Sequence, residues 1–416
     1  MRWTLSLSAL LLSMIMATPG AAQKSSAPLF QSGDRVVLLG GAFIERLQTG
    51  NYVECEISSV FASESLTFRN LGWGGDNVAG ESRAVFGSVA DGYARLLRDL
   101  NLAAPTLTIL HYGSTDIGTG SEGTEQFRSG LSRLVADVKA TGSRVALLGT
   151  MPPVPTRSRL PISEARNKAR LAFEAAIMEM AKELNCRYLT MPQLKGVAPP
   201  PSASQRRSPF AATASIDGQQ LTAFGYWSIA PLLSELLGRD REARSLLINV
   251  SRDSSTANGL DAQVKLESDN RIAIELSGTH LLRPDVPRHY GSADAETDDL
   301  LVKVAGLARG QYSVALDGTI QFTASHAELS RGVGIELASE RRQADQLRAT
   351  IARKNEYFFH RYRPQNETYL FLFRKHEQGN NAVEIPMFDP LVEDQDRLIH
   401  QLAKPPVHQI IISLAN

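Results

Sequence analysis

The residues best suited to chemistry stand directly after apolar stretches in the first half of the chain. The segments are LLGGAFIER at 38–46, NLGWGGDN at 70–77, LHYGSTD at 110–116 and SIDGQQLTAFGYW at 215–227. They contain hydroxyl and carboxylate side chains, among them Ser114, Asp116 and Asp217, but the first segment holds no nucleophile. Because ligands of parallel α/β sheets bind at the carboxyl ends of the strands, we expect the segments to share one cleft.

The elements that must position this cleft can be read from the apolar spacing. Residues 34–240 alternate short apolar runs with stretches that have apolar residues at three- and four-residue spacing. This alternation indicates a parallel sheet covered by helices on both faces, a flavodoxin-like three-layer α/β fold. From 245 to 335 the chain shows period-two alternation between Gly, Asp and Asn turns, which predicts a small antiparallel β module. Residues 336–416 are expected to form a charged helix followed by an extended polar and aromatic tail.

In this order and spacing, the four segments resemble the SGNH or GDSL-type hydrolases, an α/β family of esterases and lipases that includes sugar deacetylases. The run D-G-x-x-L-T-x-x-G-Y that begins at Asp217 is the most specific part of the resemblance. The resemblance implies that residues 40–42 occupy the G-D-S block, so that Gly41 and Ala42 replace its aspartate and its nucleophilic serine. It also implies that Asp217 keeps the place of the family's carboxylate, while Gln220 stands where the base histidine is expected.

The second and third blocks of the family supply its oxyanion hole. By resemblance, Gly75 keeps the glycine whose backbone N–H serves this hole, and Asp76 follows it. Thr115 stands where the family has an asparagine side chain, next to Ser114. The loss of one oxyanion donor costs on the order of 10² to 10³ in turnover. The threonine therefore implies a weakened hole, and we treat Gly41, Asp76 and Ser114 as candidate binding positions.

Ala42 and Gln220 cannot perform the family's chemistry. A serine attacks only when an adjacent base takes its proton, whereas alanine has no attacking atom and glutamine is not a useful base. Removing such a set costs about 10⁶ in turnover in a serine hydrolase. We therefore predict that the serine–histidine mechanism is lost. His111 is expected to be a buried residue of the third strand, satisfied by a backbone carbonyl.

Polar and aromatic residues are also dense in the C-terminal segment KNEYFFHRYRPQNETYLFLFRKHEQGNNAVEIP. One interpretation is an internal hydrogen-bond and ion-pair network that ties this segment to the hydrolase-like domain. The other is that it completes a binding site for a polar ligand such as a glycan in the same cleft. The candidates for this second role are Arg363, Asn366, Arg374, His376 and Glu377. The segment also resembles the C-terminal part of exported bacterial proteins with an SGNH-like domain.

Composition and the N-terminus limit the partners. Residues 1–22 read as an export signal, which predicts a periplasmic or extracellular protein, and no later segment is long and apolar enough to span a membrane. The 44 basic residues balance 44 acidic ones, which argues against nucleic acid as a partner. The two cysteines are expected to be buried free thiols. The eight histidines are scattered, so we expect neither a metal site nor a cofactor.

The sequence thus favours an exported SGNH-like protein that recognises an esterified or acetylated carbohydrate without the family's mechanism. One alternative is an active carbohydrate esterase or deacetylase with non-standard groups, for example a water activated by Asp217 or Asp116, or His376 and Glu377 as acid and base. Another is a structural partner in an exported complex that docks through the β module. The sequence leaves the ligand and the oligomeric state open.

Overall fold

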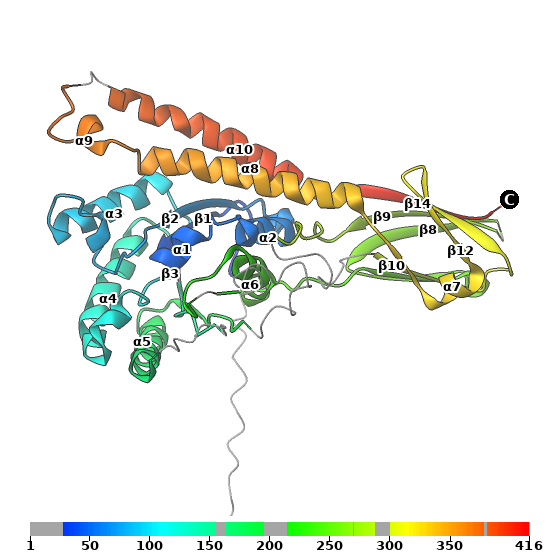
Figure 1. Cartoon of the computed structure of the whole chain (residues 1–416), viewed down its shortest axis with the longest axis horizontal. Helices are drawn as coiled ribbons and strands as arrows, with labels where there is room; N and C mark the ends of the chain where they lie inside the picture. The colour runs from blue at the N-terminus through cyan, green and yellow to red at the C-terminus, as the bar shows by residue number, and fades with distance from the viewer. Residues whose placement is uncertain are drawn as a thin grey trace, which may run out of the picture.

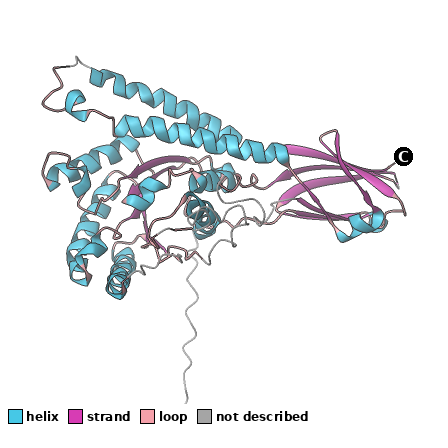
Figure 2. Ribbon diagram, viewed as in Figure 1, coloured by secondary structure: helices cyan, strands magenta, loops and turns pink. Residues whose placement is uncertain are grey.

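The computed structural model describes residues 28–154, 163–194, 214–215, 217–268, 270–287, 300–377 and 381–415. The predicted export signal lies outside these residues. The described part has three regions: a sheet surrounded by helices, a β-rich module at the opposite end, and a pair of long helices that runs along the first region toward the module (Figure 1, Figure 2). None of the helices within these ranges has the length and apolar character needed to cross a bilayer.

The first region is a parallel five-stranded sheet with the strand order β2-β1-β3-β4-β5. Its strands are β1 (Arg35–Gly40), β2 (Thr67–Gly72), β3 (Leu107–His111), β4 (Arg144–Leu148) and β5 (Arg187–Leu189). The strands alternate between two apolar cores, since Val36 and Leu38 belong to one and Val37 and Leu39 to the other. The sheet is therefore buried on both faces, which confirms the predicted three-layer α/β class.

Six helices cover the two faces of this sheet. The core that contains Val36 and Leu38 is completed by α1 (Ala42–Arg46), α2 (Tyr52–Val60) and α6 (Ala223–Leu236). The core on the other face is completed by α3 (Val89–Ala103), α4 (Thr124–Ala140) and α5 (Glu164–Glu183). Both α3 and α5 begin at a serine, Ser88 and Ser163, whose side-chain oxygen accepts a hydrogen bond from a backbone N–H of the first turn.

The β-rich module consists of two sheets that share one apolar core. One sheet has the order β13-β10-β6-β7 and the other the order β12-β11-β14-β9-β8. The strands are β6 (Ser245–Asn249), β7 (Ser254–Asn258), β8 (Leu260–Ser268), β9 (Arg271–Gly278), β10 (Leu300–Ala305), β11 (Gln311–Leu316), β12 (Thr319–Ser325), β13 (Val333–Ile335) and β14 (Val407–Leu414), with helix α7 at His326–Arg331. The predicted antiparallel module is present, although β10 and β6 pair in parallel.

The end of the chain departs from the predicted extended tail. Strand β14 inserts between β9 and β11, because alternate residues such as Ile410 and Ile412 are fully buried in the module core. Before it, α8 (Ala338–Tyr362), the short α9 (Glu367–Leu370) and α10 (Phe388–Leu402) form a helical hairpin in which α8 and α10 lie side by side (Figure 1). The module predicted to end at 335 is thus completed by the last strand of the chain.

The hairpin covers the open edge of the parallel sheet. Edge strand β2 would otherwise expose unpaired backbone carbonyls. The Phe68 carbonyl accepts a hydrogen bond from Lys354 Nζ at 3.0 Å, and the Gly72 carbonyl accepts one from the Tyr362 hydroxyl at 3.3 Å. Lys354 is fully buried and also pairs with Glu54 of α2. The hairpin therefore belongs to the hydrolase-like region in packing, although it follows the β module in sequence.

A buried carboxylate joins the hairpin to the β module. Glu340, in the first turn of α8, accepts hydrogen bonds from both terminal nitrogens of Arg244 at 2.8 and 2.7 Å. It also accepts the Leu282 backbone N–H at 2.7 Å, and its Oε2 lies 3.6 Å from His408 Nε2 of β14. Burial alone would raise the pKa of Glu340, but His408 and Arg244 outweigh it and lower the pKa to about 2.

Glu340→Gln is expected to destabilise the protein, because it leaves the buried Arg244 guanidinium without its carboxylate partner. The expected loss is about 3–5 kcal/mol in the free energy of unfolding, measured by urea titration at pH 7. Glu356→Gln is the matched control, since the Glu356 side chain is 62% exposed; its effect should stay within about 0.5 kcal/mol. Equal stability of the two variants would show that the contacts of Glu340 do not stabilise the attachment of the β module to the hairpin.

The stabilisation that Glu340 provides is expected to depend on pH. A carboxylate whose pKa is lowered by folding stabilises the protein above its unfolded pKa and loses this effect as the pH falls. The Glu340 contribution should thus be complete above pH 4.5 and fade as the pH approaches 2. The stability difference between wild type and Glu340→Gln should shrink over this range, as followed by urea titrations at stepped pH values.

Candidate functional site

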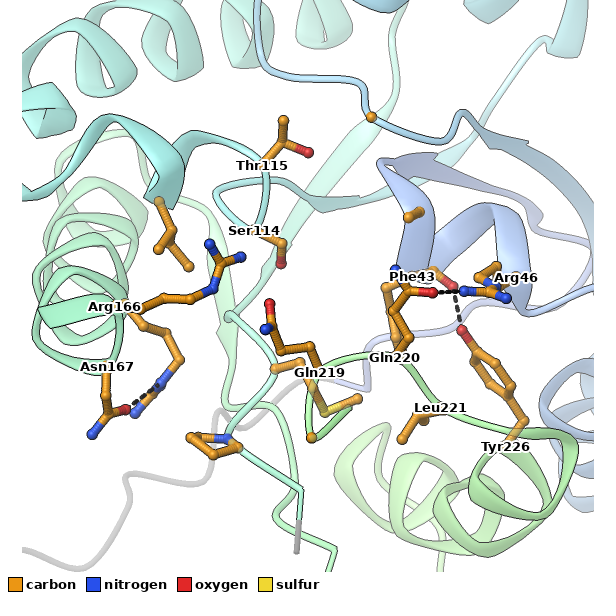
Figure 3. Close-up of a pocket in the computed structure, with 17 residues that line it drawn as sticks. Phe43, Arg46, Ser114, Thr115, Arg166, Asn167, Gln219, Gln220, Leu221 and Tyr226 are labelled. Carbon is orange, nitrogen blue, oxygen red and sulfur yellow. Dashed lines mark hydrogen bonds between the residues drawn. The ribbon is translucent and has the colours of Figure 1, made fainter. Parts of the chain in front are cut away.

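The segments that follow the parallel strands line one pocket of about 410 Å³. Ala42, Gly75, Thr115 and Gln220, the four positions assigned by resemblance, are all on its wall. Figure 3 shows Thr115 and Ser114 on one side of the pocket and Gln220, Phe43 and Tyr226 on the other. The volume is in the range of small-molecule sites. The predicted common cleft is therefore present at the carboxyl edge of the sheet.

Two glycines allow α1 to begin directly at this edge. A Cβ atom at Gly40 would lie 2.3 Å from the His111 carbonyl oxygen, and one at Gly72 would lie 2.0 Å from the Glu45 backbone nitrogen. Only glycine permits such close approach. As a result Ala42 stands in the first turn of α1, where backbone N–H groups have no intrahelical acceptor.

The turn that carries Gly75 is held by a buried ion pair. Gly75 has a φ of +78°, a conformation that glycine adopts without strain. The Asp76 carboxylate accepts hydrogen bonds from Arg83 Nε at 2.7 Å and from the Tyr112 hydroxyl at 3.1 Å, and burial raises its pKa. Asp76 is 1% exposed and is not part of the pocket wall. Asp76, which we treated as a candidate binding position, instead stabilises the turn through its buried ion pair with Arg83.

The third segment presents hydroxyl groups to the pocket. Ser114 and Thr115 both line it, and Gly41 packs behind them, since a Cβ there would lie 3.6 Å from the Thr115 hydroxyl. The next residue, Asp116, instead accepts a hydrogen bond from the Gly113 backbone N–H at 3.2 Å. Burial raises the pKa of Asp116 to about 6, but its side chain is not on the pocket wall.

Asp217 shapes the fourth segment. Its Oδ1 accepts hydrogen bonds from the backbone N–H groups of Gln219 at 2.9 Å and Gln220 at 2.7 Å. Burial would raise the pKa of the Asp217 carboxyl, but these two donors outweigh it and hold the pKa below its usual range. The pocket wall contains Gly218, Gln219 and Gln220 but not Asp217. This carboxylate therefore closes a turn that places the two glutamines.

Gln220 forms a pair with Arg46 on the pocket wall. The Gln220 side-chain oxygen accepts a hydrogen bond from the Arg46 guanidinium (Figure 3). His111 lies under the pocket with 2% exposure, and its Nδ1 is 3.4 Å from the Leu148 carbonyl oxygen. Burial lowers the pKa of His111 to about 4, as befits the neutral strand residue that the sequence predicts. Within the described residues, no histidine lines the pocket beside Ser114.

Sequence reasoning missed a group of arginines and an amide. Arg46 lies at the end of α1, while Arg166, Asn167 and Arg170 lie near the beginning of α5, and all four line the pocket. Helix α5 follows β4, so its first turns reach the same carboxyl edge as the loops after β1 and β3. The strand-edge rule applied to the fourth strand could have indicated them.

The C-terminal candidates do not reach the pocket. Among the described residues of 336–416, none lines it, which overturns the expectation that this segment completes the cleft. Arg363 instead stacks on Trp73, with its guanidinium carbon 3.5 Å from the ring centroid, and donates to Glu45 at 3.0 Å. The reason is geometric: the hairpin covers the β2 edge and supports α1 and the Gly75 turn from the side opposite the pocket.

The other four C-terminal candidates form local contacts. Arg374 pairs with Glu377 three residues later, and both are partly solvent-exposed. Asn366 has a φ of +59° and precedes α9, whose Glu367 pairs with Arg95 of α3. The exposed His376 has no contact with the pocket. The interpretation as an internal network fits these positions.

A second hollow of about 830 Å³ lies between α3 and the C-terminal segment. Exposed apolar side chains border it, among them Phe86 at 78% and Phe373 at 70% exposure. None of the residues assigned by resemblance lines this hollow. No group of three or more His, Cys, Asp or Glu side chains in the described ranges could hold a metal ion. Cys55 and Cys186 are free, the first buried and the second half-buried.

Residues 49–218 match the model of the GDSL-like Lipase/Acylhydrolase family. The chain thus carries a GDSL-like lipase/acylhydrolase domain, as its four segments predict. The match includes neither Ala42 nor Gln220, so what the structure adds for these two residues is their place on the pocket wall. No curated protein matches the chain in sequence.

Among solved structures, the chain is similar over nearly its whole length to a gut microbial diltiazem-metabolizing enzyme. The TM-score is 0.62 at 16% identity, and the alignment covers 94% of this chain and 99% of that one. A catalytic mutant of an acetylxylan esterase from Geobacillus stearothermophilus aligns with 51% of this chain and 97% of its own, at 13% identity and a TM-score of 0.37. The first likeness shows that the overall fold, which combines the hydrolase-like domain with the β module and the helical hairpin, occurs in another protein.

Arg363→Ala is expected to lower the free energy of unfolding by about 1–2 kcal/mol, because it removes the stacking on Trp73 and the pair with Glu45. Arg374→Ala is the control, since its ion pair is exposed and local, and should change stability little. Urea unfolding followed by tryptophan fluorescence measures both. A larger loss for Arg374→Ala would contradict the supporting role of Arg363.

Proposed function

We propose that the protein is an exported member of the GDSL-like hydrolases that recognises an esterified or acetylated carbohydrate without using the serine–histidine mechanism. The observation that carries this proposal is the pair of Ala42 and Gln220 on one pocket wall. The attacking atom and the base are replaced together, while the cleft remains. The export signal at residues 1–22 supports a periplasmic or extracellular location.

The remaining polar groups are suited to binding. Ser114 is the serine on the pocket wall, but no base is hydrogen-bonded to it among the described residues, so its hydroxyl stays a poor nucleophile. Asp217 Oδ1 accepts two backbone N–H groups, and neither Asp217 nor Asp116 is on the pocket wall. The amides of Asn167, Gln219 and Gln220 can exchange hydrogen bonds with sugar hydroxyls and ester carbonyls.

Apolar side chains complete a sugar-binding surface. Phe43, Met151 and Tyr226 line the pocket beside these amides. Phe43 is fixed from two sides, with its ring centroid 4.8 Å from His111 and 5.9 Å from Tyr226. The Tyr226 hydroxyl donates to the Phe43 carbonyl at 3.2 Å. Such a mixture of a rigid apolar wall and few convergent polar groups is typical of ligand sites.

The wild-type chain is expected to release 4-nitrophenol from its acetate ester no faster than a protein-free control. Ser114→Ala and Asp217→Ala should leave this background rate unchanged, because neither residue belongs to a nucleophile–base pair. A rate well above background that falls in either variant would overturn the proposal in favour of an esterase with non-standard groups.

Binding provides the complementary measurement. Calorimetry with acetylated xylo-oligosaccharides should detect an interaction that Gln219→Ala weakens by about 10-fold, as expected when buried polar partners of a ligand are removed. Gln321→Ala, an exposed glutamine of the β module, is the control and should bind like wild type. Absence of binding to acetylated and unacetylated oligosaccharides alike would contradict the carbohydrate function.

A further inference from the structure

We propose that the pocket selects a saccharide that bears an oxyanion, a carboxylate or a sulfate group, and that Arg166 and Arg170 form the subsite for it, with Arg46 adding positive charge on the facing wall. This inference rests on the proposed carbohydrate function and adds the charge of the ligand. It begins from the composition of the wall, which carries these three arginines and no aspartate or glutamate among its described residues. Arginine remains charged at every pH at which the protein is folded.

The three guanidinium groups lack carboxylate partners in the described part of the chain. Arg46 donates to the neutral amide of Gln220. Arg170 donates from Nε to the Asn167 amide oxygen at 3.2 Å and from a terminal nitrogen to the Thr150 hydroxyl at 3.5 Å. The side chain of Arg166 makes no hydrogen bond or ion pair with any described residue, and it extends toward Ser114 (Figure 3).

Other arginines of the same domain are neutralised by acidic residues. Arg69 pairs with Asp396 at 2.6 Å, Arg83 with Asp76 at 2.7 Å, and Arg128 with Glu179 at 2.9 Å. The three arginines of the pocket wall differ from these in having no carboxylate partner among the described residues. A concave site lined by one sign of charge focuses its field and attracts ligands of the opposite sign.

Two carboxylates close to the wall already accept hydrogen bonds from other groups. Glu174 follows Arg170 by one helical turn, but it accepts hydrogen bonds from the Thr150 backbone N–H at 2.6 Å and hydroxyl at 2.7 Å, and from the Tyr188 hydroxyl. Asp217 accepts the N–H groups of its own turn. Neither is on the pocket wall, so they reduce the positive field without blocking the guanidinium groups.

The arrangement of the charges suits a ligand with both an anionic and a neutral part. Arg166 and Arg46 lie on opposite sides of the pocket with Gln219 between them in the view of Figure 3. Planar guanidinium groups bind carboxylate and sulfate oxygens through paired N–H donors. The neutral amides and Phe43 remain available for the sugar ring. Carboxylated and sulfated sugars share this chemistry, and the experiment separates them.

The test uses calorimetry on the full chain with two matched pairs of probes. One pair is trigalacturonate and its carboxyl-reduced neutral form; the other is a sulfated galactan tetrasaccharide and its desulfated form. The charged member of one pair should bind at least ~10-fold more tightly than its neutral counterpart, and raising the salt concentration should weaken it. The pair that shows the preference identifies the oxyanion.

Variants locate the subsite. Arg166→Gln combined with Arg170→Gln should abolish the ~10-fold preference, because the charged form loses more affinity than the neutral form when the two positive charges are removed. Arg252→Gln, an exposed arginine of the β module, is the matched control for a lost positive charge. If the preference survives the double variant, the subsite lies elsewhere and the inference is overturned. Equal binding of charged and neutral probes also overturns it, while the carbohydrate function stands.

A small anion separates failure of the inference from failure of the carbohydrate function. Sodium sulfate, compared with sodium chloride at equal ionic strength, should raise the melting temperature of the wild type more than that of the double arginine variant. If no saccharide binds but this sulfate effect is present, the oxyanion subsite is supported and the carbohydrate function fails. If no saccharide binds and sulfate gives no arginine-dependent effect, both proposals fall.

Discussion

The parallel pairing of β1 with its two neighbours is the constraint on which the site depends. Gly40 is paired in register with Gly72 of β2 and with His111 of β3, so three strands end at one level. The chain can leave this level without collision because Gly40 and Gly72 have no side chain. Every segment that follows a strand is then directed to the same edge, and the pocket is the space that they leave between them. Its existence does not require that the original catalytic atoms be kept.

The arrangement of the strand ends also depends on the edge strand β2, which the C-terminal helical hairpin covers. The hairpin supplies hydrogen-bond donors to β2 from Lys354 and Tyr362, and it closes the network with the ion pair between Arg69 and Asp396. Buried charges of this kind contribute little net free energy when they are complete, but they are costly when one partner is lost. They therefore favour one arrangement of the hairpin. The stacking of Arg363 on Trp73 connects the hairpin to the turn that carries Gly75.

The sequence allowed the three-layer sheet to be predicted, because apolar periodicity and strand ends are local signals. The four wall positions came from the resemblance to the hydrolase family. The sequence did not reveal β14, since a strand that pairs with partners about 100 residues away carries no local sign of its neighbours. It also concealed Arg166 and Arg170. On a helix with mixed charges, an arginine that faces a pocket has the same spacing as one that faces solvent, and only the direction of α5 distinguishes them. The C-terminal cluster left two interpretations open, because dense polar and aromatic residues serve burial as well as binding.

The contact between Arg46 and Gln220 has a consequence for the chemistry that this position can support. In the family's mechanism the histidine must become an imidazolium as the serine attacks, and a guanidinium in contact with it would oppose that charge. Arg46 donates to the side chain at this position, a contact that a neutral glutamine accepts without penalty. A histidine there could accept from Arg46 only in its neutral form, with its proton affinity reduced. The arginine is thus compatible with anion binding and poorly compatible with general-base catalysis at residue 220.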